Sequence, residues 1–126
     1  MKRLLMTVTS VLCLAALPVQ AEDRSEAARE PVILINAFQV PPGKEDEAVR
    51  FWEKAAAFMR KQPGYISTAL HRSVLPDARF KLINVARWES AEAFKAASRA
   101  LRTRSGIKPL EGLVPNPSLY AIIRSD

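Results

Sequence analysis

The sequence predicts an α+β protein of the ferredoxin-like class, in which a four-stranded antiparallel sheet carries two helices on one face in the order βαββαβ. Three observations lead to this prediction. Two segments have the 3.6-residue apolar period of amphipathic helices. Each of them lies between segments in which apolar and polar residues alternate, as they do in strands. Gly and Pro mark the breaks between elements at residues 41–43 and 63–64. The pattern occupies residues 31–126, one small domain.

The first 21 residues have the features of a secretory signal peptide. Lys2 and Arg3 precede an apolar run over residues 4–17, and small residues lead to a cleavage site after Ala21. An uncleaved anchor is the alternative. A lipoprotein is disfavoured because Leu12 precedes Cys13, whereas the cysteine of a lipoprotein signal normally follows Gly, Ala or Ser. We therefore expect a periplasmic or secreted protein that has no contact with the membrane after cleavage.

Residues 22–30 are charged and lack an apolar period, which predicts a flexible linker before the domain. The chain has one cysteine, Cys13, and it lies in the predicted signal peptide. Disulfides, thiolate catalysis and cysteine-ligated metals are therefore not expected in the mature protein.

The charge pattern argues against several classes of function. The chain has 19 Lys and Arg against 13 Asp and Glu, a net charge of +6, but the basic residues are scattered and form no stripe with aromatic residues. We expect no nucleic-acid partner, although a short basic patch at residues 99–108 weakly favours anionic ligands. No phosphate-binding loop, Ser-His-Asp set or metal-ligand spacing is present, so a nucleotide enzyme or a metal hydrolase is not expected.

The first half of the domain is predicted as a strand over residues 32–40, a helix over 44–61 and a strand over 65–74. Pro41-Pro42-Gly43 ends the first strand, and Gln62-Pro63-Gly64 ends the helix. The apolar residues of the helix recur at three- and four-residue spacing: Ala48, Phe51, Trp52, Ala55, Phe58 and Met59.

The second half begins with a strand that runs directly into a helix. Period-two alternation over residues 80–88 places Asn84 and Trp88 on one apolar face, and Ser90 is a good N-cap for a helix that extends to about Arg102. An irregular connection is predicted over residues 103–117, followed by a last strand over 119–124.

One face of this sheet has no helix to cover it. Its predicted residues are apolar: Ile33, Ile35, Ala37, Ala69, Ile83, Val85 and Ile122. Because a contiguous apolar face usually has a partner, we expect a homodimer that packs sheet against sheet.

With this element order, three segments resemble the antibiotic biosynthesis monooxygenase (ABM) superfamily: Pro-Pro-Gly-Lys at 41–44, Gln-Pro-Gly-Tyr at 62–65, and Asn-Val-Ala-Arg-Trp-Glu-Ser-Ala-Glu-Ala-Phe at 84–94. The resemblance covers about residues 31–124. It implies a dimeric α+β barrel with a pocket between helices and sheet in each subunit. Well-known members oxidise phenolic or anthrone-like substrates with oxygen and without metal, flavin or haem, and a separate branch binds and degrades haem.

The resemblance also implies site residues. Asn84 and Trp88 match an Asn and a Trp, four residues apart on the third strand, that contact substrate in the monooxygenase branch. Asn36, seven residues before Gly43, matches the first-strand Asn of the haem branch. The haem-ligating His of that branch, about ten residues after the Trp, has no counterpart at residues 97–99, which argues against haem degradation.

Each of these residues also has an ordinary structural interpretation. Asn36 and Asn84 face apolar neighbours, so they either bond each other or a nearby loop, or present donors to a substrate oxyanion. Trp88 either packs in the core or stacks on a flat substrate and adds its indole N–H as a donor. Trp52 is better explained by packing. Phe38 and Phe51 are predicted as apolar contacts for the substrate.

His71 is the only histidine and the natural candidate for a general base near neutral pH. Period two places it in phase with Tyr65 and Ala69, on the uncovered face of the sheet. We therefore prefer to interpret His71 as a partly exposed or interface histidine, and proton transfer is its functional alternative.

Taken together, these features predict an exported monooxygenase that needs no cofactor and oxidises a small aromatic, phenolic or quinol substrate with O₂. The predicted catalytic residues are Asn84, Trp88 and His71, and substrate binding adds Asn36, Phe38 and Phe51. The alternative is a binding protein of the same fold, without turnover, for haem or another hydrophobic ligand.

Overall fold

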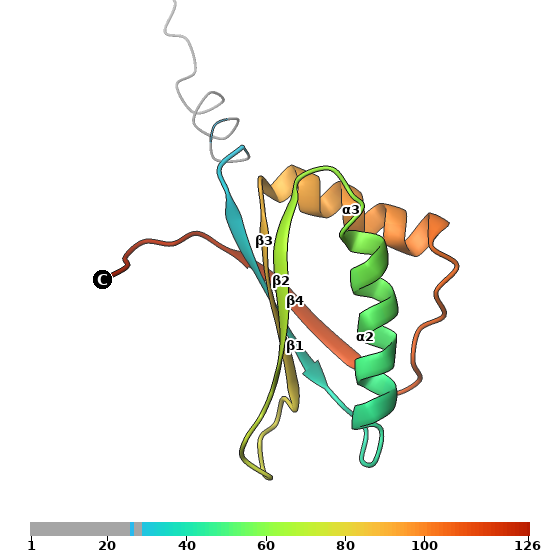
Figure 1. Ribbon diagram of the computed structural model, residues 1–126. Coiled ribbons are helices and arrows are strands. Elements are labelled where there is room, and N and C mark those ends of the chain that lie inside the picture. Colours follow the sequence, from blue (N-terminus) through green and yellow to red (C-terminus); the bar gives the residue numbers. More distant parts are fainter. Residues whose placement is uncertain (1–25, 27–28) are drawn as a thin grey trace, which may run out of the picture.

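The computed structural model describes residue 26 and residues 29–126, which follow the predicted βαββαβ order (Figure 1). The predicted signal peptide and most of the predicted linker lie outside these residues. Within them, no helix combines the length and the apolar character that crossing a membrane requires. The elements are β1 (Val32–Gln39), α2 (Glu45–Met59), β2 (Tyr65–Arg72), β3 (Leu82–Trp88), α3 (Ala91–Arg104) and β4 (Val114–Tyr120).

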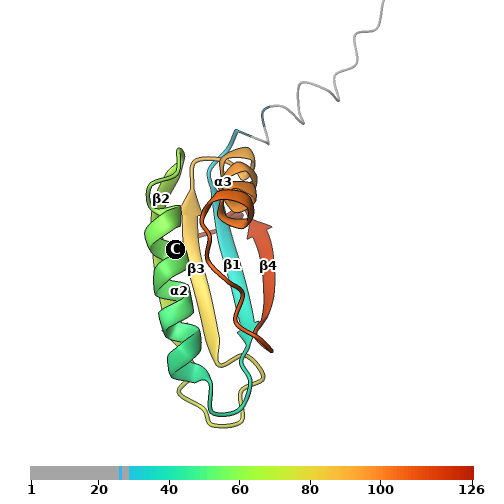
Figure 2. The ribbon, with the colours of Figure 1, turned by 90° about the vertical axis from the view of Figure 1, so that its right-hand side faces the viewer.

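The four strands form one antiparallel sheet in the order β2-β3-β1-β4. Both helices cover the same face of this sheet, α2 along the strands and α3 across one end of them (Figures 1 and 2). This arrangement confirms the predicted ferredoxin-like α+β class. The central strands β1 and β3 are aligned so that Asn36 lies directly opposite Asn84.

The last strand is the main correction to the prediction. It begins at Val114 rather than at Leu119, ends at Tyr120, and contains Pro115 and Pro117. From the sequence alone, the two prolines argue against a strand at this place. However, β4 is an edge strand, where a residue without an N–H is tolerated. Ile122 lies beyond the end of β4 and is 64% exposed, so its predicted place on the open sheet face is wrong.

The remaining boundaries differ from prediction by a few residues. The strand β2 ends at Arg72 instead of Val74, and β3 begins at Leu82 instead of Phe80. The predicted cap of α3 is confirmed, because the Ser90 hydroxyl accepts a hydrogen bond from the N–H of Ala93 at 3.1 Å.

The hydrophobic core consists of two clusters at opposite ends of the helix-covered face. One is built on Leu34, Ala86, Trp88 and Ala97, and the other on Phe38, Ala48 and Leu82. On the helix-facing side of β1, the amide of Asn36 therefore lies between apolar residues of the two clusters. Asn84 has the same place on β3. The two amides lie where the clusters separate.

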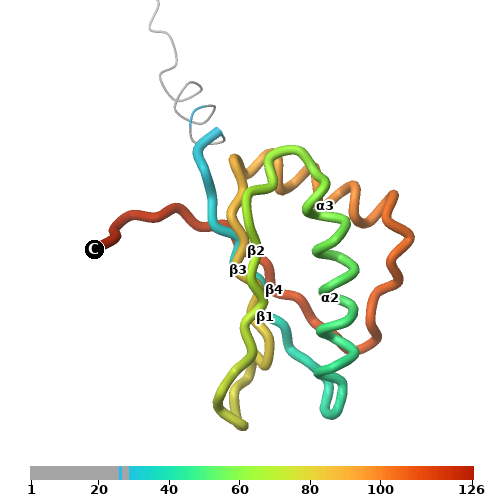
Figure 3. Tube along the Cα trace, in the orientation of Figure 1, coloured from blue at the N-terminus to red at the C-terminus, as the bar shows by residue number. Residues whose placement is uncertain are grey.

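The opposite sheet face is apolar at its centre, as predicted. The half-buried residues there are Ile33, Ile35, Ala37, Ile83 and Val85. After β4 the chain leaves the sheet on this uncovered side, away from the helices (Figures 1 and 3). A homodimer through this face remains a prediction.

The turn between α2 and β2 depends on Gly64. This residue has a positive φ of 84°, and a Cβ placed on it would lie 2.5 Å from the Cβ of Ala93 in the first turn of α3. Its carbonyl accepts a hydrogen bond from the N–H of Glu89 at 2.8 Å. The turn is therefore packed directly onto the junction of β3 and α3.

We expect Gly64→Ala to lower the free energy of unfolding by about 2–4 kcal/mol, because left-handed backbone costs about 1–2 kcal/mol and the clash with Ala93 adds overpacking. Gly43→Ala is the matched control, since Gly43 has a φ of 75° and open space around its Cβ position. That variant should lose only about 1–2 kcal/mol. Urea unfolding measures both, and equal losses would contradict the packing of this turn.

Candidate functional site

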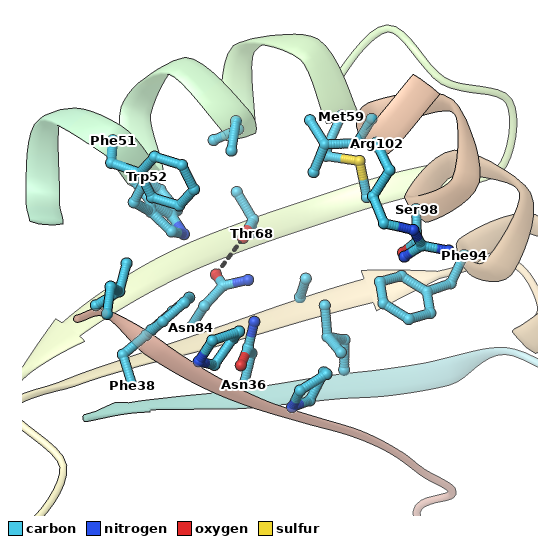
Figure 4. Close-up of a pocket in the computed structure, with 18 of the residues that line it drawn as sticks. Asn36, Phe38, Phe51, Trp52, Met59, Thr68, Asn84, Phe94, Ser98 and Arg102 are labelled. Carbon is cyan, nitrogen blue, oxygen red and sulfur yellow. Dashed lines mark hydrogen bonds between the residues drawn. The ribbon is translucent and has the colours of Figure 1, made fainter. Parts of the chain in front are cut away.

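A cavity of about 330 Å³ lies between the helices and the sheet, where the two core clusters separate (Figure 4). Its volume is near the lower end of the range of small-molecule sites, about 300–1,000 Å³. Most of the described lining is aliphatic or aromatic. The polar side chains of the lining are few: Asn36, Thr68, Asn84, Ser98 and Arg102, with the Tyr65 hydroxyl and the two indole groups.

The floor of the cavity is built on the cross-strand pair Asn36 and Asn84. Asn84 is buried, with 8% of its surface exposed, and Asn36 is half-buried. A buried amide needs hydrogen-bond partners for its oxygen and its nitrogen. The two amides do not bond each other, so each orientation is set by another neighbour.

The oxygen of Asn36 is held by the edge strand. Its Oδ1 accepts a hydrogen bond from the backbone N–H of Asn116 at 3.0 Å, and the Asn116 side chain donates in turn to the carbonyl of Ala37 at 2.9 Å. A backbone N–H is only a donor, so the Asn36 oxygen must face β4. Its NH₂ group then faces the other way, into the cavity (Figure 4).

The oxygen of Asn84 is held by β2. The Thr68 hydroxyl donates to Asn84 Oδ1 at 2.5 Å, and this bond is drawn in Figure 4. In the described part of the chain, neither the NH₂ group of Asn84 nor that of Asn36 has an acceptor. The floor of the cavity therefore presents two N–H donor groups and no acceptor from this pair.

Trp88 closes one end of the cavity. It is 1% exposed and makes edge-to-face contacts with Tyr65, at a centroid distance of 5.6 Å, and with Phe94, at 5.7 Å. Its indole N–H is buried and has no acceptor among the described residues. Trp88 thus serves core packing, and its indole N–H is a buried donor without a partner beside the site.

Tyr65 lies on the opposite face from the one that its sequence phase predicts. A bulge between Tyr65 and Ser67 shifts the register of β2 against β3. The extra residue turns Tyr65 toward Trp88 and the cavity, whereas period two alone places it beside Ala69.

The structure brings five of the six predicted site residues to one cavity: Asn36, Phe38, Phe51, Asn84 and Trp88. Trp52 lines it as well, besides packing against the cluster around Phe38. The roles of these residues in catalysis and binding remain predictions.

His71 is not part of this constellation. It is exposed and pairs with Ile83 on the uncovered sheet face, where its Nδ1 lies 3.2 Å from the carbonyl oxygen of Ile83. The fold therefore places it across the sheet from the cavity of its own subunit.

Three polar residues of the cavity were not predicted from the sequence: Thr68, Ser98 and Arg102. The helical period could have found the two on α3, because Phe94, Ser98, Leu101 and Arg102 share one face. Thr68 could be found only through its bond to Asn84, since β2 alone gives no reason to select it.

Residues 31–103 match the family described as antibiotic biosynthesis monooxygenase. The chain belongs to this family. A curated relative, heme oxygenase (mycobilin-producing) from Mycobacterium tuberculosis, is 36% identical over 66 residues. That match covers 52% of this chain and 61% of the relative, so it spans less than two thirds of the relative's length.

Solved structures of ABM-like proteins agree with this assignment. A proposed monooxygenase from Shewanella loihica PV-4 is 46% identical with a TM-score of 0.70, over 76% of this chain and 97% of that one. SnoaB, a cofactor-independent oxygenase from Streptomyces nogalater, is 24% identical with a TM-score of 0.57, over 76% and 96%. At that identity the likeness to SnoaB shows the fold alone.

The lining of this ABM cavity does not fit haem ligation by a histidine of α3. The positions that α3 contributes are Phe94, Ser98, Leu101 and Arg102, none of which carries an imidazole. Nor do the described residues contain a cluster of three or more His, Cys, Asp or Glu side chains that could hold a metal ion.

Thr68→Val should lower the free energy of unfolding by about 1–3 kcal/mol, because it leaves the buried oxygen of Asn84 without a donor. Thr68→Ser is the matched control, since it keeps the hydroxyl and should lose less than half as much. Chemical denaturation measures both variants. The role of Thr68 as the donor to Asn84 is wrong if the valine variant is as stable as the serine variant.

Proposed function

We propose that this ABM protein is an oxygenase that oxidises a small aromatic substrate, phenolic or anthrone-like, with O₂ and without a metal or an organic cofactor. The observation that carries the proposal is the pair of free N–H donor groups in an apolar cavity, supplied by Asn36 and Asn84. Such a site favours a ligand oxygen that carries negative charge, because oriented donors stabilise an oxyanion far better where water is scarce.

The chemistry requires an electron-rich substrate. A phenol or an enol that loses its proton places charge on its oxygen and on the ring carbon para to it, and that carbon can react with O₂. In the oxidation of a CH₂ group to a carbonyl, one oxygen atom of O₂ becomes the carbonyl oxygen. The other leaves as water with both hydrogen atoms, so that the reaction needs no external reductant.

Binding and deprotonation are linked in this proposal. The donors of Asn36 and Asn84 bond more strongly to the anion than to the neutral phenol, so they shift the bound substrate toward its reactive form. The described lining of the cavity has no carboxylate and no histidine, which leaves solvent as the proton acceptor. His71, on the far face of the sheet, has no part in this step.

The volume and the aromatic lining of the cavity support a flat substrate of two or three fused rings. Aromatic walls around the donors are supplied by Phe38, Phe51, Trp52 and Trp88.

We further propose that the protein is exported and acts as a homodimer, as the amino-terminal sequence and the apolar sheet face suggest.

A second candidate is a binding protein for haem or another hydrophobic ligand, which performs no turnover. The identity to the mycobilin-producing heme oxygenase favours haem as a ligand, and the absence of a histidine from the lining that α3 contributes argues against it. A titration followed at the Soret band separates the two. Saturable binding of haem without turnover would support a binding protein, whereas no spectral change would exclude haem.

Oxygen uptake with an anthrone tests the oxygenase directly. We expect the purified, metal-free protein to accelerate uptake, and Asn84→Leu to lower kcat about 100- to 1,000-fold, because it removes one donor to the developing oxyanion. Asn36→Leu should have a similar effect. Unchanged uptake in both variants would contradict the assignment of the site.

His71→Gln separates the sequence-based general base from the structure-based site. Because His71 lies outside the cavity, we expect kcat to stay within about twofold of the original value. A loss comparable to that of Asn84→Leu would restore the general base and contradict solvent as the proton acceptor.

A further inference from the structure

Arg102 is the one charged residue in the described lining of the cavity. It lies one helical turn after Ser98 on α3, and Figure 4 shows its guanidinium group on the cavity side of the helix, near Ser98. The residue is largely exposed, so it lies where the cavity meets solvent. A ligand on the amide floor would therefore have its far end near this cation.

Arg102 has no anionic partner within the described part of the chain. The ion pairs found there join Lys44 with Glu47, and Arg72 with Glu45 and Asp46. The cavity lining itself contains no carboxylate. The five N–H donors of this guanidinium are thus free to bind a ligand.

The ordinary explanation for Arg102 is the helix terminus. Basic residues in the last turn of a helix are favourable near its partial negative charge, and α3 ends with Arg102 and Arg104. Arg104 meets this need equally well, yet it does not line the cavity. The helix terminus therefore does not explain why Arg102 lies in the cavity lining.

The charge of the site selects one kind of ligand. A single guanidinium balances a group with one negative charge, and its planar fork matches the two oxygens of a carboxylate. An uncharged ligand group in the same place could accept a hydrogen bond from the guanidinium but would leave its positive charge unbalanced. The N–H donors of the floor bind a second oxygen at the other end of the ligand.

We propose that the substrate of this cavity is an aromatic acid, held by Asn36 and Asn84 at its phenolic end and by Arg102 at its carboxylate. The inference rests on the proposed function, which it deepens by naming the substrate class. Arg102 is then the residue that determines specificity, and it binds away from the carbon that reacts with oxygen.

Isothermal titration calorimetry without oxygen tests this binding independently of turnover. The probes are 6-hydroxy-2-naphthoate and 6-hydroxy-2-naphthamide, which share a ring system and a phenol and differ in charge. At low salt the protein should bind the acid at least about fivefold more tightly than the amide, because only the carboxylate adds an attraction between opposite charges to its hydrogen bonds with the guanidinium. The preference should shrink as salt is added.

Arg102→Gln should reduce the ratio of the two dissociation constants to about one, while it leaves binding of the amide within about twofold. Unchanged binding of the amide shows that the cavity of the variant is intact. Arg104→Gln is the matched control from the same helical turn and should keep the preference. Arg102→Lys keeps the charge without the fork, so we expect an intermediate ratio.

A second cationic surface provides the competing explanation. A groove lined by Arg50, Lys54 and Lys108 adjoins the cavity, because Pro109 and Leu110 line both. If Lys108→Gln removes the preference for the acid and Arg102→Gln keeps it, the carboxylate binds in the groove and the inference is wrong. It is equally wrong if the original protein shows no preference, whether it binds both probes or neither.

The inference and the oxygenase proposal can fail separately. Oxygen uptake with an uncharged anthrone, without any preference for the acid probe, overturns only the role of Arg102. A preference for the acid that depends on Arg102, without uptake from any anthrone, keeps that role and overturns the oxygenase.

Discussion

The cross-strand pair Asn36 and Asn84 divides the core of this protein, and the cavity occupies the space between the two resulting clusters. Apolar side chains at these two positions would continue the rows of β1 and β3 and join the clusters. A polar pair cannot be buried in that way, because each amide needs partners for both of its ends. The position of the site thus follows from two residues that interrupt otherwise apolar strand faces.

The polarity of the site is decided by the neighbours of these amides. An Asn side chain offers an acceptor and a donor group, and rotation by half a turn exchanges them. The backbone N–H of Asn116 and the hydroxyl of Thr68 each engage the oxygen, so the nitrogen is directed to the cavity in both cases. Donors fixed in this way need little reorganisation when a charged oxygen arrives.

Sequence periodicity was sufficient for the order of the elements and for the face that carries Asn36, Asn84 and Trp88. It failed where a local irregularity interrupts the period, as at the bulge that turns Tyr65 inward. It also failed for β4, whose prolines are acceptable only because that strand lies at the sheet edge, a fact that depends on the complete topology. Arg102 was missed because its charge suggested a solvated surface.

The prolines of β4 also affect how copies of this chain can meet. An exposed edge strand invites another strand to pair with it, and such pairing leads to open-ended association. Pro115 and Pro117 have no N–H to offer to an incoming strand, so this edge is a poor template for extension. The same two residues that form part of the cavity wall thus discourage a further strand from pairing along this edge of the sheet.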